Sequence, residues 1–147
     1  MRVESCAVTY RKATIRPNRP EDESVLFGLA QGVFGGESEW SDSRTLTALE
    51  TDTVFVAEVD GEPAGYAAVE REGDAVCIEQ LLVSPVHEGE GVGRQLLEYA
   101  EGWAIAGGAA RLQVVVEADN RRALDFYRGR GFVPVGDVLY ELTLPHE

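Results

Sequence analysis

Three alternating glycines form the pattern in this sequence that points most directly to chemistry. Gly89, Gly91 and Gly93 follow the apolar run Leu81-Leu82-Val83 and lead straight into a segment with helical periodicity. Glycine lets backbone N–H groups turn inward without hindrance from a Cβ atom, and the start of a helix adds partial positive charge. A loop of this kind is suited to hold a phosphate group.

Two familiar nucleotide-binding motifs fit this loop poorly. A Walker A loop requires Gly-Lys-Ser/Thr, whereas Gly93 is followed by Arg94-Gln95. A Rossmann fingerprint needs GxGxxG in the first βα turn of a parallel sheet, and here the spacing is GxGxG after a predicted β-meander. By itself the glycine pattern is weak evidence, because a flexible loop with a close helix contact would also use it.

Other residues near this loop could bind a ligand or carry protons. Glu79 lies on an apolar run, where a carboxylate either faces solvent or sits in a cleft with a raised pKa. Asn120 is well placed as a helix N-cap, and Tyr127 follows on the same helix. Glu117 reads as a solvated residue at a strand end, and His87 as an exposed loop residue without a partner in sequence.

The hydrophobic pattern predicts the elements that position these residues. Strands are expected at Ala13–Arg16, Val54–Val59, Ala64–Glu70, Ala75–Val83, Leu112–Val116, Phe132–Val135 and Leu139–Leu144. Helices are expected at Pro20–Phe34, Ser41–Leu49, Gly91–Ala106 and Arg121–Arg128. We expect Leu112–Val116 to be buried on both faces and Trp103 to lie in the core. The order predicts an α/β or α+β fold with a mixed sheet.

Length and charge narrow the classes of function. At 147 residues the chain is expected to form one domain over residues 1–147. The net charge of −13 disfavours binding to nucleic acid or to anionic membranes. Two cysteines, Cys6 and Cys77, make no disulfide framework, and the sequence contains no metal-ligand spacing. Since neither a signal peptide nor a membrane span is apparent, a cytoplasmic protein is expected. Only Lys12 among 13 basic residues is a lysine, and adaptation to a high-salt cytoplasm is one reading of this composition that the sequence leaves open.

Taken together, the stretch Glu79–Gly131 resembles the central core of the GNAT superfamily of acetyl-CoA-dependent N-acetyltransferases. The resemblance rests on the strand that ends Leu-Leu-Val-Ser-Pro, the loop Glu88–Gly93, the helix that begins Arg94-Gln95-Leu96-Leu97, and Asn120 followed by Ala123–Tyr127 and Gly131-Phe132. It implies a GNAT-like central sheet of six to seven strands, mixed and mostly antiparallel, flanked by about four helices. No metal is called for.

The resemblance also implies which residues bind the cosubstrate. Main-chain groups of Leu81, Leu82 and Val83 would bond the pantetheine arm, as would Asn120. The pyrophosphate would be held by the loop residues Glu88, Gly89, Glu90, Gly91, Val92, Gly93 and Arg94. The family usually has Arg or Gln at Glu88, so this acid and Glu90 are expected to weaken CoA binding unless both point outward. Arg94, Arg121, Arg122 and Arg128 could offset their charge.

The implied reaction is direct transfer of an acetyl group to a primary amine of a small molecule or protein. Tyr127 would protonate the CoA thiolate, and Glu79 would take the amine proton directly or through water, with Glu117 in reserve. Val115 stands where enzymes that acetylate ribosomal-protein N-termini commonly carry a glutamate, which argues against that substrate. Trp40 and Tyr66 either line the acceptor pocket or simply pack. A non-catalytic acyl-CoA-binding module and a partner-dependent protein acetyltransferase are the alternatives. The sequence leaves the oligomeric state open, and a homodimer would agree with the habit of the family.

Overall fold

Strands and helices follow one another along the chain much as the sequence predicts. The computed structural model describes residues 10–34, 45, 48–50 and 52–145. The strands are β1 (Thr14–Pro17), β2 (Thr53–Val59), β3 (Glu62–Glu72), β4 (Ala75–Val83), β5 (Arg111–Val115), β6 (Val133–Pro134) and β7 (Leu139–Thr143). The helices are α1 (Glu23–Phe34), α3 (Val92–Ala106) and α4 (Arg121–Gly129), with short 3-10 turns at Pro20–Asp22 and Pro85–His87.

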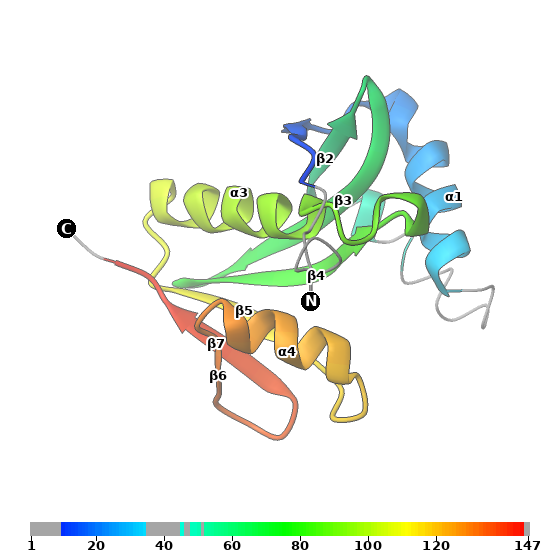
Figure 1. Cartoon of the computed structure of the whole chain (residues 1–147). Helices are drawn as coiled ribbons and strands as arrows, with labels where there is room; N and C mark the ends of the chain where they lie inside the picture. The colour runs from blue at the N-terminus through cyan, green and yellow to red at the C-terminus, as the bar shows by residue number, and fades with distance from the viewer. Residues whose placement is uncertain (1–9, 35–44, 46–47, 51, 146–147) are drawn as a thin grey trace. The chain divides into compact units, whose positions relative to one another are not determined.

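The strands of this part of the chain form one seven-stranded sheet in the order β1-β2-β3-β4-β5-β7-β6 (Figure 1). β4 and β5 run parallel, whereas β1 with β2, β5 with β7, and β6 with β7 run antiparallel. The predicted mixed, mostly antiparallel sheet is therefore confirmed. Of the predicted helix Ser41–Leu49, only Thr45 and residues 48–49 fall in the described part, and these are helical.

The chain forms two compact units. Unit 1 consists of residues up to 68 together with residues 80–99, and unit 2 consists of residues 69–79 and 100–147. β3, β4 and α3 each contribute residues to both units. The single domain over residues 1–147 stays a prediction.

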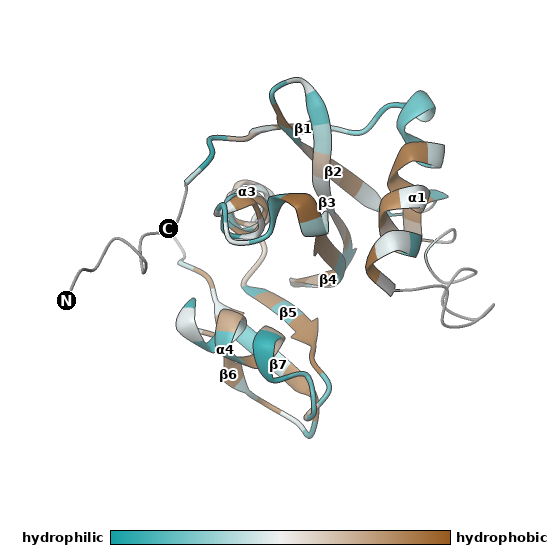
Figure 2. Cartoon of the chain, turned by 45° about the vertical axis from the view of Figure 1, so that its right-hand side comes forward, coloured by the Kyte–Doolittle hydropathy of each residue, from teal (hydrophilic) through white to brown (hydrophobic). Residues whose placement is uncertain are grey.

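Unit 1 has apolar clusters on both faces of its strands. Alternation along β2 sends Val54 and Val56 into one cluster and Ala57 and Val59 into the other. The first cluster contains Leu26 and Ala30 of α1, and the second contains Val92 and Leu96 of α3. α1 and the first half of α3 therefore lie on opposite faces of β2 and β3 (Figure 2).

The first helix buries a narrower face than its sequence predicts. Leu26 and Ala30 are buried, but Val25 and Val33, which stand at helical spacing with them in the sequence, are 48% and 39% exposed. A cluster of charges fixes the turn before α1. Arg16 donates to Asp22 Oδ2 at 2.8 Å and to Glu58 Oε2 at 3.0 Å, and Arg19 N donates to Asp22 Oδ2 at 2.6 Å. The hydrogen bond from Arg16 is the main reason that the pKa of Asp22 lies below its usual value.

Unit 2 packs aromatic residues between α4 and its strands. Tyr127 and Phe132 are buried, and their rings lie 5.2 Å apart in an edge-on arrangement.

The prediction that the strand 112–116 is buried on both faces is wrong. β5 instead alternates, with Leu112 and Val114 buried and Val115 56% exposed, as expected for a strand with only one covered face. Trp103, expected in the core, is half-buried.

Within the described residues, no helix is both long and apolar enough to span a membrane.

Candidate functional site

The loop between β4 and α3 adopts the conformation for which its glycines are needed. After the turn Pro85–His87, Gly89 has φ +78° and Gly91 has φ +82°, a left-handed region that residues with a Cβ atom rarely enter. Gly93 already belongs to α3. Two of the three glycines in the motif are thus required by the backbone itself.

The first turn of α3 presents donors at the end of this loop. Gln95 N donates to Gly91 O at 3.2 Å, which is the first main-chain bond of the helix. The N–H groups of Val92, Gly93 and Arg94 precede that bond and have no acceptor within the helix. These donors and the positive end of the helix dipole are what an anion-binding site needs. The side chain of Val92 is 1% exposed and anchors the turn in the core.

A glutamine clamp, which the sequence analysis missed, holds the loop to the chain before β1. Gln95 Nε2 donates to Arg11 O at 2.8 Å and to Gly91 O at 3.1 Å, and Gln95 Oε1 accepts from Ala13 N at 2.9 Å. Arg11 N in turn donates to Glu90 O at 2.9 Å. The sequence gives one indication of this role, because Gln95 is a polar residue on the buried side of α3, directly before Leu96.

The loop carries two acidic side chains, of which Glu90 is half-buried against His87 and Glu88 is exposed. Glu90 Oε1 lies 2.7 Å from His87 Nδ1, and these side chains are only 18% and 21% exposed. The expectation of an exposed, unpartnered His87 is therefore wrong, because the turn brings it back onto Glu90. Glu88 is exposed. Arg94, proposed to offset this charge, pairs with Glu98 at 3.4 Å along the helix.

The end of β4 extends beyond its parallel partner. Pairing with β5 ends at Ile78 opposite Val114, whereas β4 continues to Val83. Leu82 is 5% exposed in one apolar cluster of unit 1, and Leu81 and Val83 pack against the other. Because these side chains are engaged in packing, the main chain is the part of this segment suited to contact a ligand.

A buried hydrogen-bond chain supports β4 from unit 1. Tyr66 OH donates to Gln80 Oε1 at 2.6 Å, and Gln80 Nε2 donates to Thr45 Oγ1 at 2.9 Å. Tyr66 is 0% and Thr45 1% exposed, and burial raises the pKa of Tyr66 well above its usual value. Of the two roles considered for Tyr66, packing is the one seen. Trp40 lies outside the described residues.

In unit 2, α4 carries the two residues that the sequence singled out. Asn120 Oδ1 accepts from Ala123 N at 3.2 Å, so the predicted N-cap is confirmed. Tyr127 lies two turns further along and is 7% exposed. Its ring packs edge-on against Phe126 and Phe132, and burial raises the pKa of its phenol well above the usual value. Arg121 and Arg122 are exposed, and Arg128 lies over the ring of Tyr140.

Glu79 also belongs to unit 2, near Cys77 on β4, and is half-buried. Cys77 is half-buried and directs Sγ toward Gln113 Oε1 at 3.7 Å. Burial is the main cause that raises the pKa of Cys77 to about 12, followed by Glu72 and the charge of Glu79. Glu117 is exposed. Among the residues described, no group of three or more His, Cys, Asp or Glu side chains is placed to hold a metal ion.

Comparisons with known proteins agree with this geometry. The model of the acetyltransferase (GNAT) family matches residues 24–132. Streptothricin acetyltransferase from Streptomyces lavendulae is 36% identical over 120 residues, which cover 79% of this chain and 59% of that protein. Aminoglycoside N(6')-acetyltransferase type 1 from Stenotrophomonas maltophilia is 28% identical over 138 residues, which cover 86% of this chain and 90% of that protein.

Solved structures share the fold. The PaiA N-acetyltransferase from Thermoplasma acidophilum, solved in complex with coenzyme A, superposes with a TM-score of 0.74 at 19% identity, over 90% of this chain and 99% of the other. The chain spans only 59%, 42% and 62% of the length of three curated relatives that it matches.

Proposed function

This chain belongs to the acetyltransferase (GNAT) family, and from that premise we propose that it transfers an acetyl group from acetyl-CoA directly to a primary amine. The observation that carries the proposal is the loop between β4 and α3. Its left-handed Gly89 and Gly91 lead into a helix whose first N–H groups lack helical acceptors. This is a cradle for a pyrophosphate built from main-chain atoms.

Main-chain recognition explains how the loop can hold a pyrophosphate in spite of its acidic side chains. Glu90 is turned onto His87, which removes one carboxylate from the mouth of the loop. Glu88 is exposed and can remain in solvent. Backbone N–H groups at Gly89–Arg94 do not depend on either side chain. The free edge of β4 from Leu81 to Val83 would bond the pantetheine arm in the same manner.

Tyr127 is the proposed acid for the leaving group. Acetyl transfer expels a thiolate whose ordinary pKa is about 8.5, and a phenol with an ordinary pKa of about 10 can donate a proton or a hydrogen bond to it. Burial raises the pKa of Tyr127 further, so the phenol stays protonated at neutral pH. Asn120, at the start of the same helix, caps the helix with its side-chain oxygen and would donate to the cosubstrate with its side-chain nitrogen.

Glu79 is the proposed base. An alkylamine with an ordinary pKa of about 10.4 is almost entirely protonated at neutral pH, so a proton must be removed before it attacks the thioester. Glu79 is half-buried at the point where β4 leaves its parallel partner. Main-chain donors near Leu82 would polarise the thioester carbonyl. Glu117, exposed at the end of its strand, remains the reserve candidate.

A small, positively charged amine is the acceptor that we favour. The relatives from Streptomyces lavendulae and Stenotrophomonas maltophilia are named for streptothricin and for aminoglycosides. The net charge of −13 would raise the local concentration of a cationic acceptor. A cytoplasmic location and a homodimer complete the proposal, which involves no metal.

A thiol-release assay tests the activity. Purified protein is incubated with acetyl-CoA and a panel of amino acids, polyamines, aminoglycosides, streptothricin and peptides, and free CoA is measured, with calorimetry of acetyl-CoA binding in parallel. We expect binding and acceptor-dependent release of CoA. Binding without release over the whole panel would favour the non-catalytic acyl-CoA-binding module, and absence of binding would reject both functions.

A further inference from the structure

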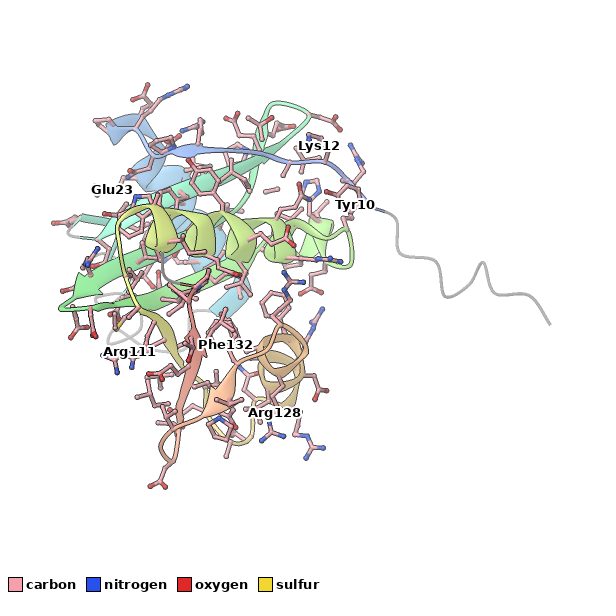
Figure 3. All side chains as sticks on the ribbon, turned by 90° about the vertical axis from the view of Figure 1, so that its left-hand side faces the viewer. Tyr10, Lys12, Glu23, Arg111, Arg128 and Phe132 are labelled. Atoms are coloured by element: carbon pink, nitrogen blue, oxygen red, sulfur yellow. The ribbon has the colours of Figure 1, made fainter. Side chains whose placement is uncertain are left out.

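An exposed aromatic ring lies directly against the glycine loop. A Cβ atom placed on Gly91 would meet Tyr10 Cδ1 at 3.0 Å and Tyr10 Cε1 at 3.3 Å. Tyr10 is nevertheless 62% exposed, so one part of its ring covers Gly91 and most of it faces solvent. Figure 3 shows Tyr10 at the end of α3 where the glycine loop begins the helix.

The backbone that carries this ring is fixed to the loop. Arg11 N donates to Glu90 O at 2.9 Å, and Arg11 O accepts from Gln95 Nε2 at 2.8 Å. The guanidinium of Arg11 pairs with Asp60 and is thereby turned to the β2–β3 hairpin. Tyr10 is thus attached to a residue that is bonded through both main-chain groups, and its ring is held beside Gly91.

The position of Tyr10 suits the adenosine of coenzyme A, for which the proposed site names no other residue. The pantetheine arm is assigned to β4, which enters the loop at one end, and the pyrophosphate to the loop itself. An adenosine that continues in the same direction beyond the pyrophosphate would reach the other end of the loop, where Gly91 joins α3 and where Tyr10 lies. A flat aromatic side chain binds a base through its π-face without requiring charge, which suits a loop that carries Glu88 and Glu90.

We infer that Tyr10 stacks on the adenine ring of coenzyme A and thereby makes the protein selective for the complete nucleotide over shorter pantetheine derivatives. The inference rests on the proposed function. A different role for the ring, as an apolar cover that keeps Gly91 in its left-handed conformation, makes a different prediction. A cover would support binding of every ligand that uses the loop, with or without adenosine.

Calorimetry with two ligands separates these roles. CoA contains adenosine, whereas 4'-phosphopantetheine lacks it but retains the pantetheine arm and a phosphate. We expect Tyr10→Ala to weaken CoA binding about tenfold, as loss of a base–aromatic stack does, and to leave 4'-phosphopantetheine unchanged. A parallel loss for both ligands, or no loss for CoA, would overturn the inference.

Two further variants keep the test decisive if Tyr10→Ala folds poorly. Tyr10→Phe and Tyr10→Leu both cover Gly91, but only phenylalanine can stack, so Phe should retain CoA affinity and Leu should lose it about tenfold. Equal CoA affinities for Phe and Leu would also overturn the inference. Val86→Ala, at an 81% exposed position before the loop, is the control and should change neither affinity. Failure of the unmodified protein to bind CoA would instead reject the proposed function.

Discussion

Gly65 on β3 faces the carbonyl oxygen of Leu82 on β4 at a distance that leaves no room for a side chain. A Cβ atom on Gly65 would lie 2.5 Å from Leu82 O and 3.1 Å from Val83 Cα. The two strands are also joined by Ser84 N, which donates to Ala64 O at 2.8 Å. Gly65 therefore sets the position of the main chain that we propose to bond the pantetheine arm.

Gly65→Ala should both destabilise the protein and weaken CoA binding. The added methyl group must push β4 aside, and overpacking of this kind costs about 1–3 kcal/mol. Urea unfolding measures the loss, and calorimetry with CoA measures the effect on the site. Gly102→Ala is a matched control, because a Cβ atom there, on α3, meets nothing within 4 Å. The control should be neutral or stabilise the protein by about 0.5–1 kcal/mol, and equal behaviour of both variants would contradict the close approach at Gly65.

The buried pair Tyr66 and Gln80 should be strongly coupled in stability. Tyr66→Phe leaves Gln80 Oε1 without its donor in a buried environment, which costs about 1–3 kcal/mol. Once Gln80 is replaced by leucine, the same Tyr66→Phe change should cost much less. A double-mutant cycle by urea unfolding should give a coupling energy of about 1 kcal/mol or more. Additive effects of the two changes would show that the 2.6 Å bond contributes no net stability.

Low pH should lower the folding stability of the protein, partly because Asp22 becomes protonated. Because the pKa of Asp22 is lowered in the folded protein, mainly by Arg16, its contribution is fully present above its unfolded pKa of about 3.9 and is lost as pH falls below that value. Asp22→Asn should therefore lower stability at neutral pH and flatten the decline of stability below about pH 4. Asp60→Asn, at a largely exposed ion pair, is the control and should change stability at neutral pH by less than about 1 kcal/mol. Thermal unfolding from pH 7 to pH 3 measures both.

Asn120 has a capping role that can be separated from a ligand-binding role. Asn120→Ala removes the bond to Ala123 N and should cost about 1 kcal/mol, whereas Asn120→Ser keeps a capping oxygen and should restore most of that loss. If the amide also bonds the cosubstrate, Asn120→Ser should still bind CoA more weakly than the unmodified protein. Unchanged CoA affinity in Asn120→Ser would limit Asn120 to capping.

Local patterns were sufficient to predict β4, the glycine loop and α4, because each is encoded by neighbouring residues. β4 has the predicted bounds, and Asn120 caps α4 as expected. The contacts of Gln95 with Arg11 and Ala13 could not be predicted in this way, because they join residues more than 80 positions apart. The hydrophobic periodicity of either segment carries no information about which distant residue it will contact.

Burial was harder to predict than secondary structure. The run Leu112–Val116 is apolar except for Gln113, yet Val115 is 56% exposed, because the hydrophobic pattern does not reveal whether a second layer covers a strand. His87 shows the opposite error. It was expected in solvent, but the turn Pro85–His87 folds it back to within 2.7 Å of Glu90. In both cases tertiary structure determines the environment of the side chain.

Tyr127→Phe should abolish most turnover while leaving fold and cosubstrate affinity nearly intact. Phenylalanine preserves the edge-on contacts of this ring with Phe126 and Phe132, at 5.0 and 5.2 Å, so only the hydroxyl is lost. If that hydroxyl protonates the thiolate, kcat should fall by about 10²–10⁴-fold, and the Kd for acetyl-CoA should change little. The thiol-release assay with the best acceptor, together with calorimetry, measures both quantities.

Tyr140→Phe is the matched control for this prediction, because Tyr140 and Tyr127 lie in the same unit and are equally buried, at 7% exposure. The hydroxyl of Tyr140 accepts a 3.4 Å contact from Arg128 and has no proposed role in the reaction. Its removal should leave kcat unchanged. Since burial raises the pKa of Tyr127, its phenol remains protonated through the neutral range, and the rate should not decline there through loss of this proton. Equal turnover in Tyr127→Phe and Tyr140→Phe would remove the assigned role, and the leaving thiolate would then have to take its proton from solvent.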